Sequence, residues 1–515
     1  MDIDKDIFNL IEEQANIYKD KLAIIDDNIN VKLTYSELEK KSYEYGNYLL
    51  NMGLKKGDKV IIFVQMNVYL YEIMISLFRN GIIAVFVDPH AGFKYVDMCC
   101  ELVKPNAVIA KNIHMFYLCL SKSIRNIKKK ITVESMIKNK VNCETRIPVN
   151  ETRENFINTD ALITFTSGTT GIPKVIVRTQ KFLIDQHKII DTLISDSNNT
   201  VIMTSLPIFL LSHLASGMTC VIPRGKWRQP KDIKLRMILE QLLEHNCETI
   251  VSSPILIEKL LYNVNDDIKI MLEKSKLKYI YMGGSPVFPS KIEYYKENYK
   301  NIGITIIYGS SEAEPISECK INNISDDKIK LMRDGKGLYV GSFSEGIEYK
   351  LISIDDETVL NKGYGELIVS GDHVLKGYLN GIGDSENKLD MDGIKWHKTG
   401  DVGYIDDNNE FWLLGKKKGI INKNENIIFP FSIEAQLYYD RRIDKNAIIM
   451  IDNKSYIAIK INKNYKNEKN KIKSELEQKY HDFIVIFLND IPTEKRHSSK
   501  IDYDKLKQII TSKRL

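Results

Sequence analysis

The stretch that decides the fold is Thr164-Phe165-Thr166-Ser167-Gly168-Thr169-Thr170-Gly171-Ile172-Pro173-Lys174. It follows the apolar run 161–163, which is typical of a buried strand end, and it precedes the β-branched run 175–179, which predicts a second strand. Its glycines let backbone N–H groups approach a phosphate because no Cβ intervenes, while its hydroxyls and Lys174 add donors and a positive charge. The expected structure is a phosphate-binding loop between two strands.

Two other interpretations of this stretch are weaker. A Thr- and Gly-rich turn in a plain hairpin would need none of this chemistry. A Walker A loop requires a lysine followed by Ser or Thr at the start of a helix, whereas Lys174 is followed by Val175 and Ile176. The pattern therefore favours a phosphate loop of another lineage.

Length and composition limit the class of protein. A chain of 515 residues is too long for one compact core, so two or more domains are expected. A hydrophobic content of 43% with 27% charged residues is typical of a soluble globular protein. The charge of +5, from 73 basic and 68 acidic residues, argues against nucleic acid as a main partner, and Lys128-Lys129-Lys130 is expected to be a solvated face. Seven cysteines without zinc-site spacing fit a reduced cytoplasm.

No targeting or membrane-spanning segment is expected. Residues 1–6 are acidic and have no apolar core, so no signal peptide is apparent. The run 201–223 contains no Asp, Glu, Lys or Arg and has the length of a membrane span, but Pro207 and several polar residues interrupt it. Two buried strands flanking a helix are the better interpretation of this run.

The order of patterns along the chain indicates an α/β architecture. Residues 1–150 alternate strand and helix patterns, which predicts a mainly parallel sheet covered on both faces. Thr34 is expected to cap one long helix, with Glu37 at the capping-box position. The run 121–150 is polar and rich in lysine, and it is predicted to be an irregular surface connection. Helix–strand units continue to about residue 282, strands dominate after residue 346, and the last hundred residues indicate a small α/β unit.

Two strands are expected to end in residues suited to a nucleotide, at the edge where open α/β sheets bind their ligands. The first runs into Gly283-Gly284-Ser285, and the second into Tyr308-Gly309-Ser310-Ser311-Glu312. Tyr308 can stack on adenine, Ser311 can bond a phosphate, and Glu312 can hold Mg²⁺ through its oxygens. A plain turn would explain either motif alone, but their combination with the phosphate loop favours a binding site.

Two later residues complete the candidate site. Asp401 follows Gly400 and is placed to accept two ribose hydroxyl protons, although an isolated Asp after a glycine is more often a turn residue. Lys500 stands in a polar loop before the last expected helix, and taken alone it is one lysine among many.

Taken in order, these motifs resemble the signature of the adenylate-forming superfamily, which includes acyl-CoA synthetases, nonribosomal-peptide adenylation domains and luciferases. Tyr308 to Glu312 is similar to its Tyr-Gly-x-Thr-Glu motif, with Ser311 at the Thr position, and Thr399-Gly400-Asp401 matches its Thr-Gly-Asp motif. The resemblance implies a large N-terminal domain of mixed, mostly parallel sheets flanked by helices with a β-rich subdomain, followed by a small mobile α+β domain. The expected boundaries are 1–417 and 418–515.

The resemblance also implies an activity and a set of site residues. ATP with Mg²⁺ would activate a carboxylic acid to an acyl-adenylate, and the acyl group would pass to the thiol of coenzyme A or of the phosphopantetheine of an acyl carrier protein. Lys500 would bridge the carboxylate and the phosphate, delivered by rotation of the small domain about a hinge at Lys418. The implied catalytic residues are Thr166, Lys174, Glu312 (also the metal ligand) and Lys500, and the implied nucleotide-binding residues are Ser167, Gly168, Thr169, Thr170, Gly171, Gly283, Gly284, Ser285, Tyr308, Gly309, Ser310, Ser311, Asp401 and Lys416.

Three positions depart from the family's usual pattern. Lys416 stands where the hinge segment commonly has Arg, which keeps the charge but loses the forked geometry. Asn422 replaces a frequent lysine, and Glu425 replaces a common glycine in a loop that lines the approach of the thiol. These departures bear on the second half-reaction, and they leave the first untouched.

The segment after Pro207 bears on the acid. Amino-acid-adenylating relatives place an Asp where this chain has Leu210, and a buried ammonium beside Leu210 without a counter-charge would be costly. An apolar, fatty-type acyl group is therefore the expectation, while plain core packing would explain the same residues. Two alternatives remain, a β-lactone synthetase acting on a 3-hydroxy acid without a thiol and a degenerate acyl- or nucleotide-binding protein. The expected substrate-pocket residues are Phe209, Leu210, His213, Met282 and Gly284.

Overall fold

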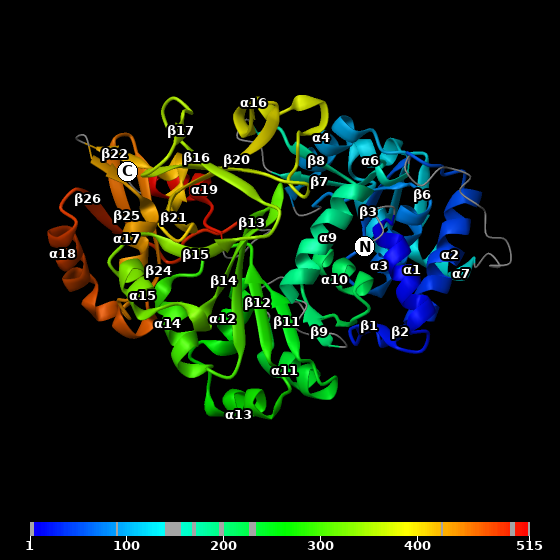
Figure 1. Cartoon of the computed structure of the whole chain (residues 1–515), viewed down its shortest axis with the longest axis horizontal. Coiled ribbons are helices and arrows are strands. Elements are labelled where there is room, and N and C mark those ends of the chain that lie inside the picture. Colours follow the sequence, from blue (N-terminus) through cyan, green and yellow to red (C-terminus); the bar gives the residue numbers. More distant parts are fainter. Residues whose placement is uncertain are drawn as a thin grey trace.

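Two sheets that share a helical layer form most of the molecule (Figure 1). The structure is a computed structural model that describes residues 5–88, 91–139, 156–166, 171–194, 200–225, 233–423, 426–494 and 500–512. The N-terminal part, in blue and cyan, lies on the right of Figure 1, and the C-terminal part, in orange and red, lies on the left. The middle of the chain, in green, lies between these ends.

The first sheet has six strands in the order β6-β5-β3-β4-β7-β8, all parallel except the last pair. Buried residues of helices α1, α2 and α3 pack on one of its faces, and those of α4, α5 and α6 pack on the other. Its strands are β3 (Lys59–Phe63), β4 (Ile83–Val85), β5 (Ala107–Ala110), β6 (Lys129–Thr132), β7 (Asp160–Thr166) and β8 (Lys174–Thr179), and its helices are α1 (Ile7–Ile17), α2 (Tyr35–Asn51), α3 (Val68–Arg79), α4 (Phe93–Val103), α5 (Asn112–Leu118) and α6 (Lys122–Asn126).

The second sheet has fifteen strands and changes character along its length. The run β1-β10-β9-β11-β12-β13 is parallel, and every pairing from β13 onward to β17 is antiparallel. Its strands are β1 (Leu22–Asp26), β2 (Val31–Thr34), β9 (Val201–Thr204), β10 (Thr219–Val221), β11 (Thr249–Ser252), β12 (Tyr279–Gly283), β13 (Gly303–Ser310), β14 (Ala313–Lys320), β15 (Leu338–Phe343), β16 (Glu348–Ile352), β17 (Val359–Leu360), β18 (Tyr364–Ser370), β19 (Lys388–Met391), β20 (Ile394–Ile405) and β21 (Glu410–Lys416).

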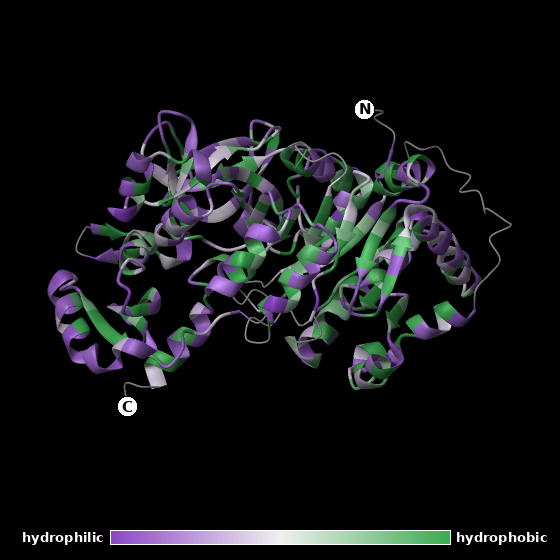
Figure 2. Ribbon diagram, turned by 90° about the horizontal axis from the view of Figure 1, so that it is seen from below, coloured by the Kyte–Doolittle hydropathy of each residue, from purple (hydrophilic) through white to green (hydrophobic). Residues whose placement is uncertain are grey.

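Helices cover the parallel half of the second sheet because its strands are apolar on both faces. Along β12 the side chains of Ile280 and Met282 pack into one core cluster, and that of Tyr281 packs into another on the opposite face. In Figure 2 the strands are largely green, while purple gathers on the helices and turns around them. The helices concerned are α9 (Gln180–Ile194), α10 (Pro207–Ala215), α11 (Leu235–Glu244), α12 (Pro254–Leu261), α13 (Asp266–Lys274), α14 (Pro289–Asn298) and α15 (Asp326–Arg333).

The C-terminal unit has a small sheet and two core clusters of its own. Strands β24 (Ile443–Ile451) and β25 (Lys454–Ile461) form a hairpin, and β26 (Phe483–Phe487) adds to it in parallel. The remaining elements are the hairpin β22 (Ile421–Lys423) and β23 (Asn426–Ile428) and the helices α17 (Pro430–Leu437), α18 (Lys469–Lys479) and α19 (Tyr503–Ser512). The predicted fold class, a mixed and mostly parallel α/β body with a β-rich part and a small α+β unit, is confirmed.

Several local predictions can be checked directly. Thr34 caps α2 and makes the capping box with Glu37 as expected, and the run 201–223 is strand, helix and strand. The irregular connection expected over 121–150 is wrong for its described part, because α6, β6 and α7 (Val133–Lys138) lie there. Ile131 and Met136 are buried, so a few apolar residues fix elements that charged neighbours had masked. Of the helices described, none combines the length and the apolar character needed to cross a bilayer.

Candidate active site

Two hairpins, one from each sheet, meet at the site. Strands β7 and β8 pair antiparallel so that Thr166 stands opposite Lys174, on either side of the glycine-rich loop. Strands β13 and β14 form the second hairpin, with Glu312 in its tight turn. The Oγ1 atom of Thr166 lies 3.5 Å from Oε1 of Glu312, which joins the two hairpins. The sequence predicted a strand that ends at Tyr308, and the structure shows that β13 continues to Ser310 and that the chain then turns back at once into β14.

Arg178 ties the same hairpins together from inside. Its guanidinium donates to Oγ1 of Thr164 at 2.8 Å and to the carbonyl oxygen of Ser311 at 2.5 Å. Burial lowers the pKa of Arg178 to about 10, which still leaves it charged at neutral pH. A buried cation that bonds both hairpins fixes the distance between them. Strand β8, which carries Arg178, therefore holds the two hairpins together as well as pairing with β7.

Glu312 is held as a carboxylate by its neighbours. Burial alone would raise its pKa, but the neighbouring His397, a hydrogen bond from Tyr378 and the charge of Lys174 lower it below the usual range. The hydroxyl of Tyr378 donates to Oε1 of Glu312 at 2.7 Å. Because burial lowers the pKa of His397 to about 3, that imidazole is neutral at pH 7, and Tyr378 and Lys174 are the partners that matter there.

Lys174 points across the site. Its Nζ atom donates to Oδ1 of Asn387 at 3.1 Å and lies 5.1 Å from the ring centroid of Tyr378. The stem packs so closely on Gly383 that a Cβ there would stand 2.6 Å from Cδ of Lys174. Burial lowers the pKa of Lys174, an effect that Glu312 opposes. The side chain is therefore a partly desolvated cation beside the Glu312 carboxylate.

Asp401 lies inside β20 and holds two side chains. The hydroxyl of Tyr308 donates to Oδ2 at 2.8 Å, and Nζ of Lys416 lies 2.8 Å from Oδ1. The turn predicted around Asp401 is instead a strand in which Gly400 has a φ of +68°. The ring of Tyr308 packs 5.8 Å from that of Phe411. Ribose binding by Asp401 and adenine stacking by Tyr308 remain predictions, and both residues lie at one place.

Lys500 is the site residue predicted in the C-terminal unit. Its backbone carbonyl accepts the N–H of Glu494 at 2.9 Å, and a β-bridge joins Thr493 to Ile501. Burial raises the pKa of Glu314, and the charges of Arg178 and Lys500 oppose that rise. The charge of Lys500 therefore acts on Glu314, a carboxyl group two residues from Glu312.

The remaining predicted nucleotide-site residues are glycines and hydroxyls at the strand ends. Ser167, Gly168, Thr169 and Thr170 lie outside the described residues. Gly171 has a φ of +79° with open space around it. Close packing requires glycine at positions 283 and 309, because a Cβ at either position would stand 2.8 Å from a backbone oxygen. The strand-end residues concerned are Gly283, Gly284, Ser285, Gly309, Ser310 and Ser311, of which Gly283 and Gly309 are the two so constrained.

The predicted substrate-pocket residues do not come together. Phe209 and Leu210 on α10 belong to the core cluster between the sheets, whereas Met282 packs into the cluster on the opposite face of β12. His213 is fully buried, and burial lowers its pKa to about 3, with the charge of His187 adding to this. Gly284 is exposed at the strand end with a φ of +96°. Core packing accounts for the three apolar residues.

Comparison with known proteins identifies the family. The family of AMP-binding enzymes matches residues 11–379. The chain belongs to this family. It is similar to 4-coumarate-CoA ligase 1 of Narcissus pseudonarcissus, 21% identical over 455 residues that cover 85% of this chain and 80% of that protein. It is also 22% identical to the olefin beta-lactone synthetase of Xanthomonas campestris over 442 residues, 82% of this chain and 78% of the relative.

Solved structures of other proteins share the fold of this AMP-binding enzyme. O-succinylbenzoate coenzyme A synthetase from Bacillus subtilis, solved with ATP and magnesium ion, superposes with a TM-score of 0.78 at 20% identity, covering 97% of this chain and 99% of that one. The adenylate-forming superfamily expected from the motifs is confirmed, and the chain is an AMP-forming ligase. The residues that would serve it lie at the carboxyl ends of β7 and β12 and at the turn after β13.

The donor set of the AMP-binding enzyme fits a magnesium ion. The Glu312 carboxylate is ionised, and the Thr166 hydroxyl stands 3.5 Å from it. Carboxylate and hydroxyl oxygens are the ligands that Mg²⁺ takes, together with phosphate oxygens of its nucleotide. The ion when bound would neutralise phosphate charge and polarise the phosphoryl group.

Five residues of this AMP-binding enzyme's site escaped the sequence analysis as site residues. His397 lies four residues before Asp401, so it is close to a predicted motif, but no sequence pattern indicates that it lies beside Glu312. Lys388 lies 3.3 Å from Nδ1 of His397, and burial lowers the pKa of Lys388 to about 8. No local signal marks Tyr378, because its contact with Glu312 spans 66 residues. The five residues are Arg178, Tyr378, Asn387, Lys388 and His397.

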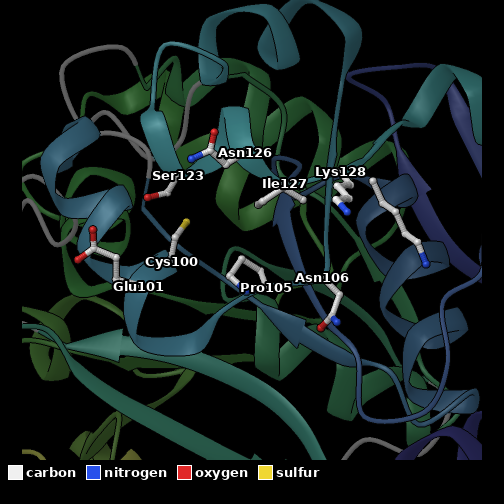
Figure 3. Close-up of a pocket in the computed structure, with 9 residues that line it drawn as sticks. Cys100, Glu101, Pro105, Asn106, Ser123, Asn126, Ile127 and Lys128 are labelled. Carbon is white, nitrogen blue, oxygen red and sulfur yellow. The ribbon is translucent and has the colours of Figure 1, made fainter.

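A hollow of about 480 Å³ lies away from this site (Figure 3). Its walls include Asn106, just before β5, and Lys129, at the start of β6. It therefore opens at the amino ends of the parallel strands, whereas the phosphate loop leaves the carboxyl end of β7. Ligands of such sheets bind at the carboxyl edge, so the hollow is not part of the AMP-binding site.

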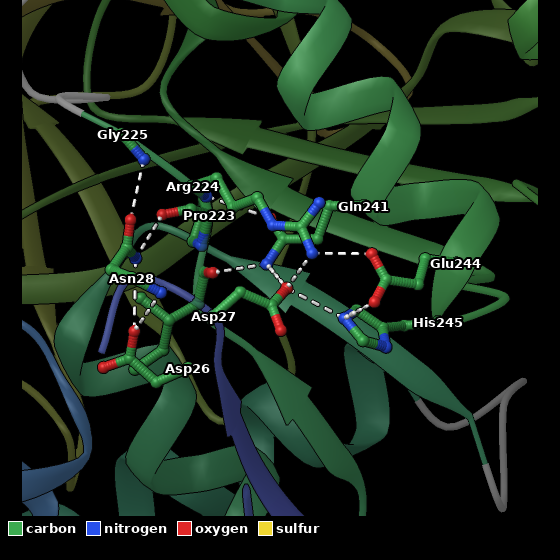
Figure 4. A network of polar contacts seen from close by, with 10 residues as sticks. Asp26, Asp27, Asn28, Pro223, Arg224, Gly225, Gln241, Glu244 and His245 are labelled. Atoms are coloured by element: carbon green, nitrogen blue, oxygen red, sulfur yellow. Dashed lines mark hydrogen bonds and ion pairs between the residues drawn. The ribbon is translucent and has the colours of Figure 1, made fainter. Parts of the chain in front are cut away.

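A cluster of Asp27, Glu244 and His245 has the residue types of a metal site, but a cation already occupies its centre (Figure 4). The guanidinium of Arg224 lies 3.0 Å from Oδ2 of Asp27 and 2.6 Å from Oε2 of Glu244. Nε2 of His245 lies 2.8 Å from the same Asp27 oxygen. The cluster is thus an ion-pair network that joins α11 to the end of β1.

Proposed function

We propose that this enzyme uses ATP to convert a carboxylic acid with an apolar chain, fatty or otherwise, to an acyl-adenylate, and then transfers the acyl group to a thiol. The thiol would belong to coenzyme A or to the phosphopantetheine of a carrier protein. One observation supports the proposal: Oγ1 of Thr166 lies 3.5 Å from Glu312, and Tyr308, on the same hairpin as Glu312, donates to Asp401. The phosphate-loop strand, the proposed metal ligand and the proposed ribose ligand are thus linked through one hairpin.

Each residue has a role in the proposed first step. A substrate carboxylate oxygen attacks the α-phosphorus of ATP, the new P–O bond forms, and the bond to pyrophosphate breaks. The charge that gathers on the phosphate and the incoming carboxylate is met by Lys500 and by Lys174. Asp401 would bind the ribose, and the ionised Glu312 with Thr166 would hold the magnesium ion of the nucleotide. The product is an acyl-adenylate, and its AMP is a good leaving group when the thiol attacks the acyl carbon.

The proposed division is 1–417 and 418–515, with Lys418 as the hinge. The chain leaves β21 and makes a single 3₁₀ turn over Lys417–Gly419. Lys417 is anchored to the larger body, because its Nζ lies 2.8 Å from Oε2 of Glu366, which also accepts the N–H of Gly400 at 3.1 Å through Oε1. The first position beyond that anchor is Lys418, so rotation there would move Lys500 while the nucleotide-binding residues stay fixed.

An apolar acid is proposed from the sequence, in which Leu210 stands where amino-acid-adenylating relatives place an Asp, and helix α10, whose buried side chains pack in the core, adds no charge there. The helix has no Asp, Glu, Lys or Arg between Pro207 and Ala215. Its one ionisable group, His213, is neutral at pH 7 because its pKa lies at about 3. A charged acid side group would therefore find no partner on this helix.

The test is carboxylate-dependent exchange of pyrophosphate into ATP across a panel of acids. This assay reports the activated acid without the acceptor being known. Exchange with fatty and other apolar acids, and little with charged ones, is expected. Absence of exchange with every acid would overturn the ligase, and exchange with amino acids or dicarboxylic acids alone would overturn the apolar class. Thioester formation is then measured with coenzyme A and with a phosphopantetheinylated carrier protein.

β-Lactone formation from a 3-hydroxy acid is the second candidate, favoured by the similarity to an olefin beta-lactone synthetase. The acyl-adenylate would then be attacked by the acid's own hydroxyl oxygen, with loss of AMP and of the hydroxyl proton. Turnover of 3-hydroxy acids with no thiol present, with the lactone identified by mass spectrometry, would establish it. Strict dependence on a thiol for the same acids would eliminate it.

A further inference from the structure

Helix α5 carries apolar residues on two sides. Met115 and Leu118 are buried against the outer face of the six-stranded sheet. Ile113, Phe116 and Tyr117 face away from that core and are 78%, 85% and 56% exposed, and Leu120 in the turn that follows is 63% exposed. A helix that is apolar all round is normally buried. These four residues, spaced i, i+3, i+4 and i+7, form a single exposed stripe, called here the α5 stripe.

Basic residues border the α5 stripe. Lys111 caps the start of α5, Lys122 follows Leu120 by two residues, and Lys94 is next to Phe93, whose ring lies 4.9 Å from that of Tyr117. Among the described parts of the chain, no ion pair is found for any of these three lysines.

Two carboxylates beside the ends of the stripe accept hydrogen bonds from its neighbouring residues. Oε2 of Glu134 accepts the N–H of Asn112 at 3.0 Å, and Oδ1 of Asp97 accepts from Ser121 and Ser123. Both carboxylates stay ionised in these hydrogen bonds, so the three lysines against the two carboxylates leave the border with a small net positive charge.

The position of the stripe relates it to the active site. Strands β3, β4, β5 and β7 are parallel, so their carboxyl ends share one edge of the sheet. Helix α5 begins two residues after the end of β5, and the phosphate loop begins directly after β7. The start of α5 and the end of β7 at Thr166 therefore lie along the same edge, and α4 is seen near β7 and β8 in Figure 1.

We propose that the α5 stripe, with Lys94, Lys111 and Lys122, docks this enzyme on the anionic surface of a lipid bilayer. Exposed Phe, Ile and Leu enter the acyl boundary, a Tyr ring suits the headgroup level, and lysines on long stems reach lipid phosphates. A second protein fits less well, since a stable interface takes about 20–30 residues from each side and the stripe offers four apolar ones. Docking would turn the phosphate-loop edge toward the bilayer, where an apolar acid partitions; only this last link rests on the proposed function.

Vesicle sedimentation of the full chain tests the proposal. Binding is expected to vesicles of phosphatidylglycerol with phosphatidylcholine, to weaken with salt, and to be much lower with phosphatidylcholine alone. The double variant Ile113→Ser/Phe116→Ser should lower the partition coefficient by at least about tenfold. Lys94→Gln/Lys111→Gln/Lys122→Gln should lower it on anionic vesicles only. Ile270→Ser on α13, where the native side chain is 46% exposed, is the matched control and should bind as the native chain does.

Two results would overturn the proposal. The first is a failure of vesicle binding to depend on the stripe: the native chain stays in the supernatant with anionic vesicles, or the Ile113→Ser/Phe116→Ser variant sediments with them to the same extent as the native chain. The second is a dimer, seen by light scattering, that this variant converts to monomer. Pyrophosphate exchange with a water-soluble acid should be unchanged in all variants, which shows that they fold. Because vesicle binding needs no substrate, its failure and a failure of the ligase proposal are separate observations.

Discussion

The hydroxyl of Tyr378 lies 2.7 Å from Oε1 of Glu312, across 66 residues of chain, and both side chains are buried. The same carboxylate oxygen lies 3.5 Å from Oγ1 of Thr166. One tyrosine therefore orients the group proposed to hold the magnesium ion, and it keeps that group ionised. This contact connects the chain between β18 and β19 to the turn between β13 and β14.

The first prediction concerns that contact. Tyr378→Phe should raise the magnesium concentration for half-maximal pyrophosphate exchange by about tenfold, because a hydrogen bond to a charged group is worth about 1.5–3 kcal/mol. Tyr404→Phe, on the same strand as Asp401, is the control and should leave the requirement unchanged. An unaltered magnesium dependence in Tyr378→Phe would show that Glu312 does not hold the ion.

The second prediction concerns Lys500. Lys500→Ala should lower pyrophosphate exchange by roughly 10²–10³-fold, since a preorganised charge that meets the reacting phosphate is lost. Thioester formation from supplied acyl-adenylate should persist, because that step does not need this cation. Lys505→Ala and Lys507→Ala on α19 provide matched controls in the same segment. If Lys500→Ala spares exchange, the C-terminal unit does not deliver the catalytic cation.

The third prediction is a pH dependence of stability. Burial raises the pKa of Glu434 from 4.5 to about 7, although the N–H of Ile448 and the hydroxyl of Tyr503 donate to it. The folded state then binds more protons than the unfolded state between these values, so stability falls as pH rises through that window. The difference, about 2.5 pH units, corresponds to about 3 kcal/mol.

Urea denaturation at pH 5 and pH 8 tests this dependence. Between these values the native chain should lose up to about 3 kcal/mol relative to Glu434→Gln, which cannot ionise. Glu273→Gln, at an exposed position on α13, should follow the native chain. Parallel pH profiles for the native chain and Glu434→Gln would mean that Glu434 ionises as freely when folded as when unfolded. Tyr503 lies three residues after Lys500, so the contact also holds the segment that carries the lysine proposed to be catalytic.

Local patterns were enough to predict much of the fold. Hydrophobic periodicity and caps act within a few residues, which is why the capping box of Thr34 and Glu37 and the strand–helix–strand over 201–223 were predicted correctly. Strand β6 was missed because it carries two lysines beside a single deeply buried Ile131. Strand β6 lies at the edge of its sheet, where backbone hydrogen bonds to β5 can hold a strand that has few apolar side chains.

The residues of the candidate site also fall into those with a local sequence pattern and those without one. Motif residues such as Glu312 and Asp401 were visible because their chemistry sits next to glycines and hydroxyls in the sequence. Tyr378 and Asn387 were not, because their roles arise only when distant segments meet. The side of a strand that each residue faces is also a property of the folded sheet, and so Met282 could not be assigned to one face from its sequence neighbours.

The last prediction separates packing from substrate selection at Leu210. This side chain is fully buried within the cluster between the sheets, so Leu210→Ala should lower the free energy of unfolding by about 2–5 kcal/mol. The relative rates of pyrophosphate exchange across the acid panel should stay the same, because the cavity would open inside the core and away from the acid. Leu331→Ala, where the native side chain is 41% exposed, should change neither quantity. A shifted acid preference with unchanged stability would instead make Leu210 a wall of the acyl pocket.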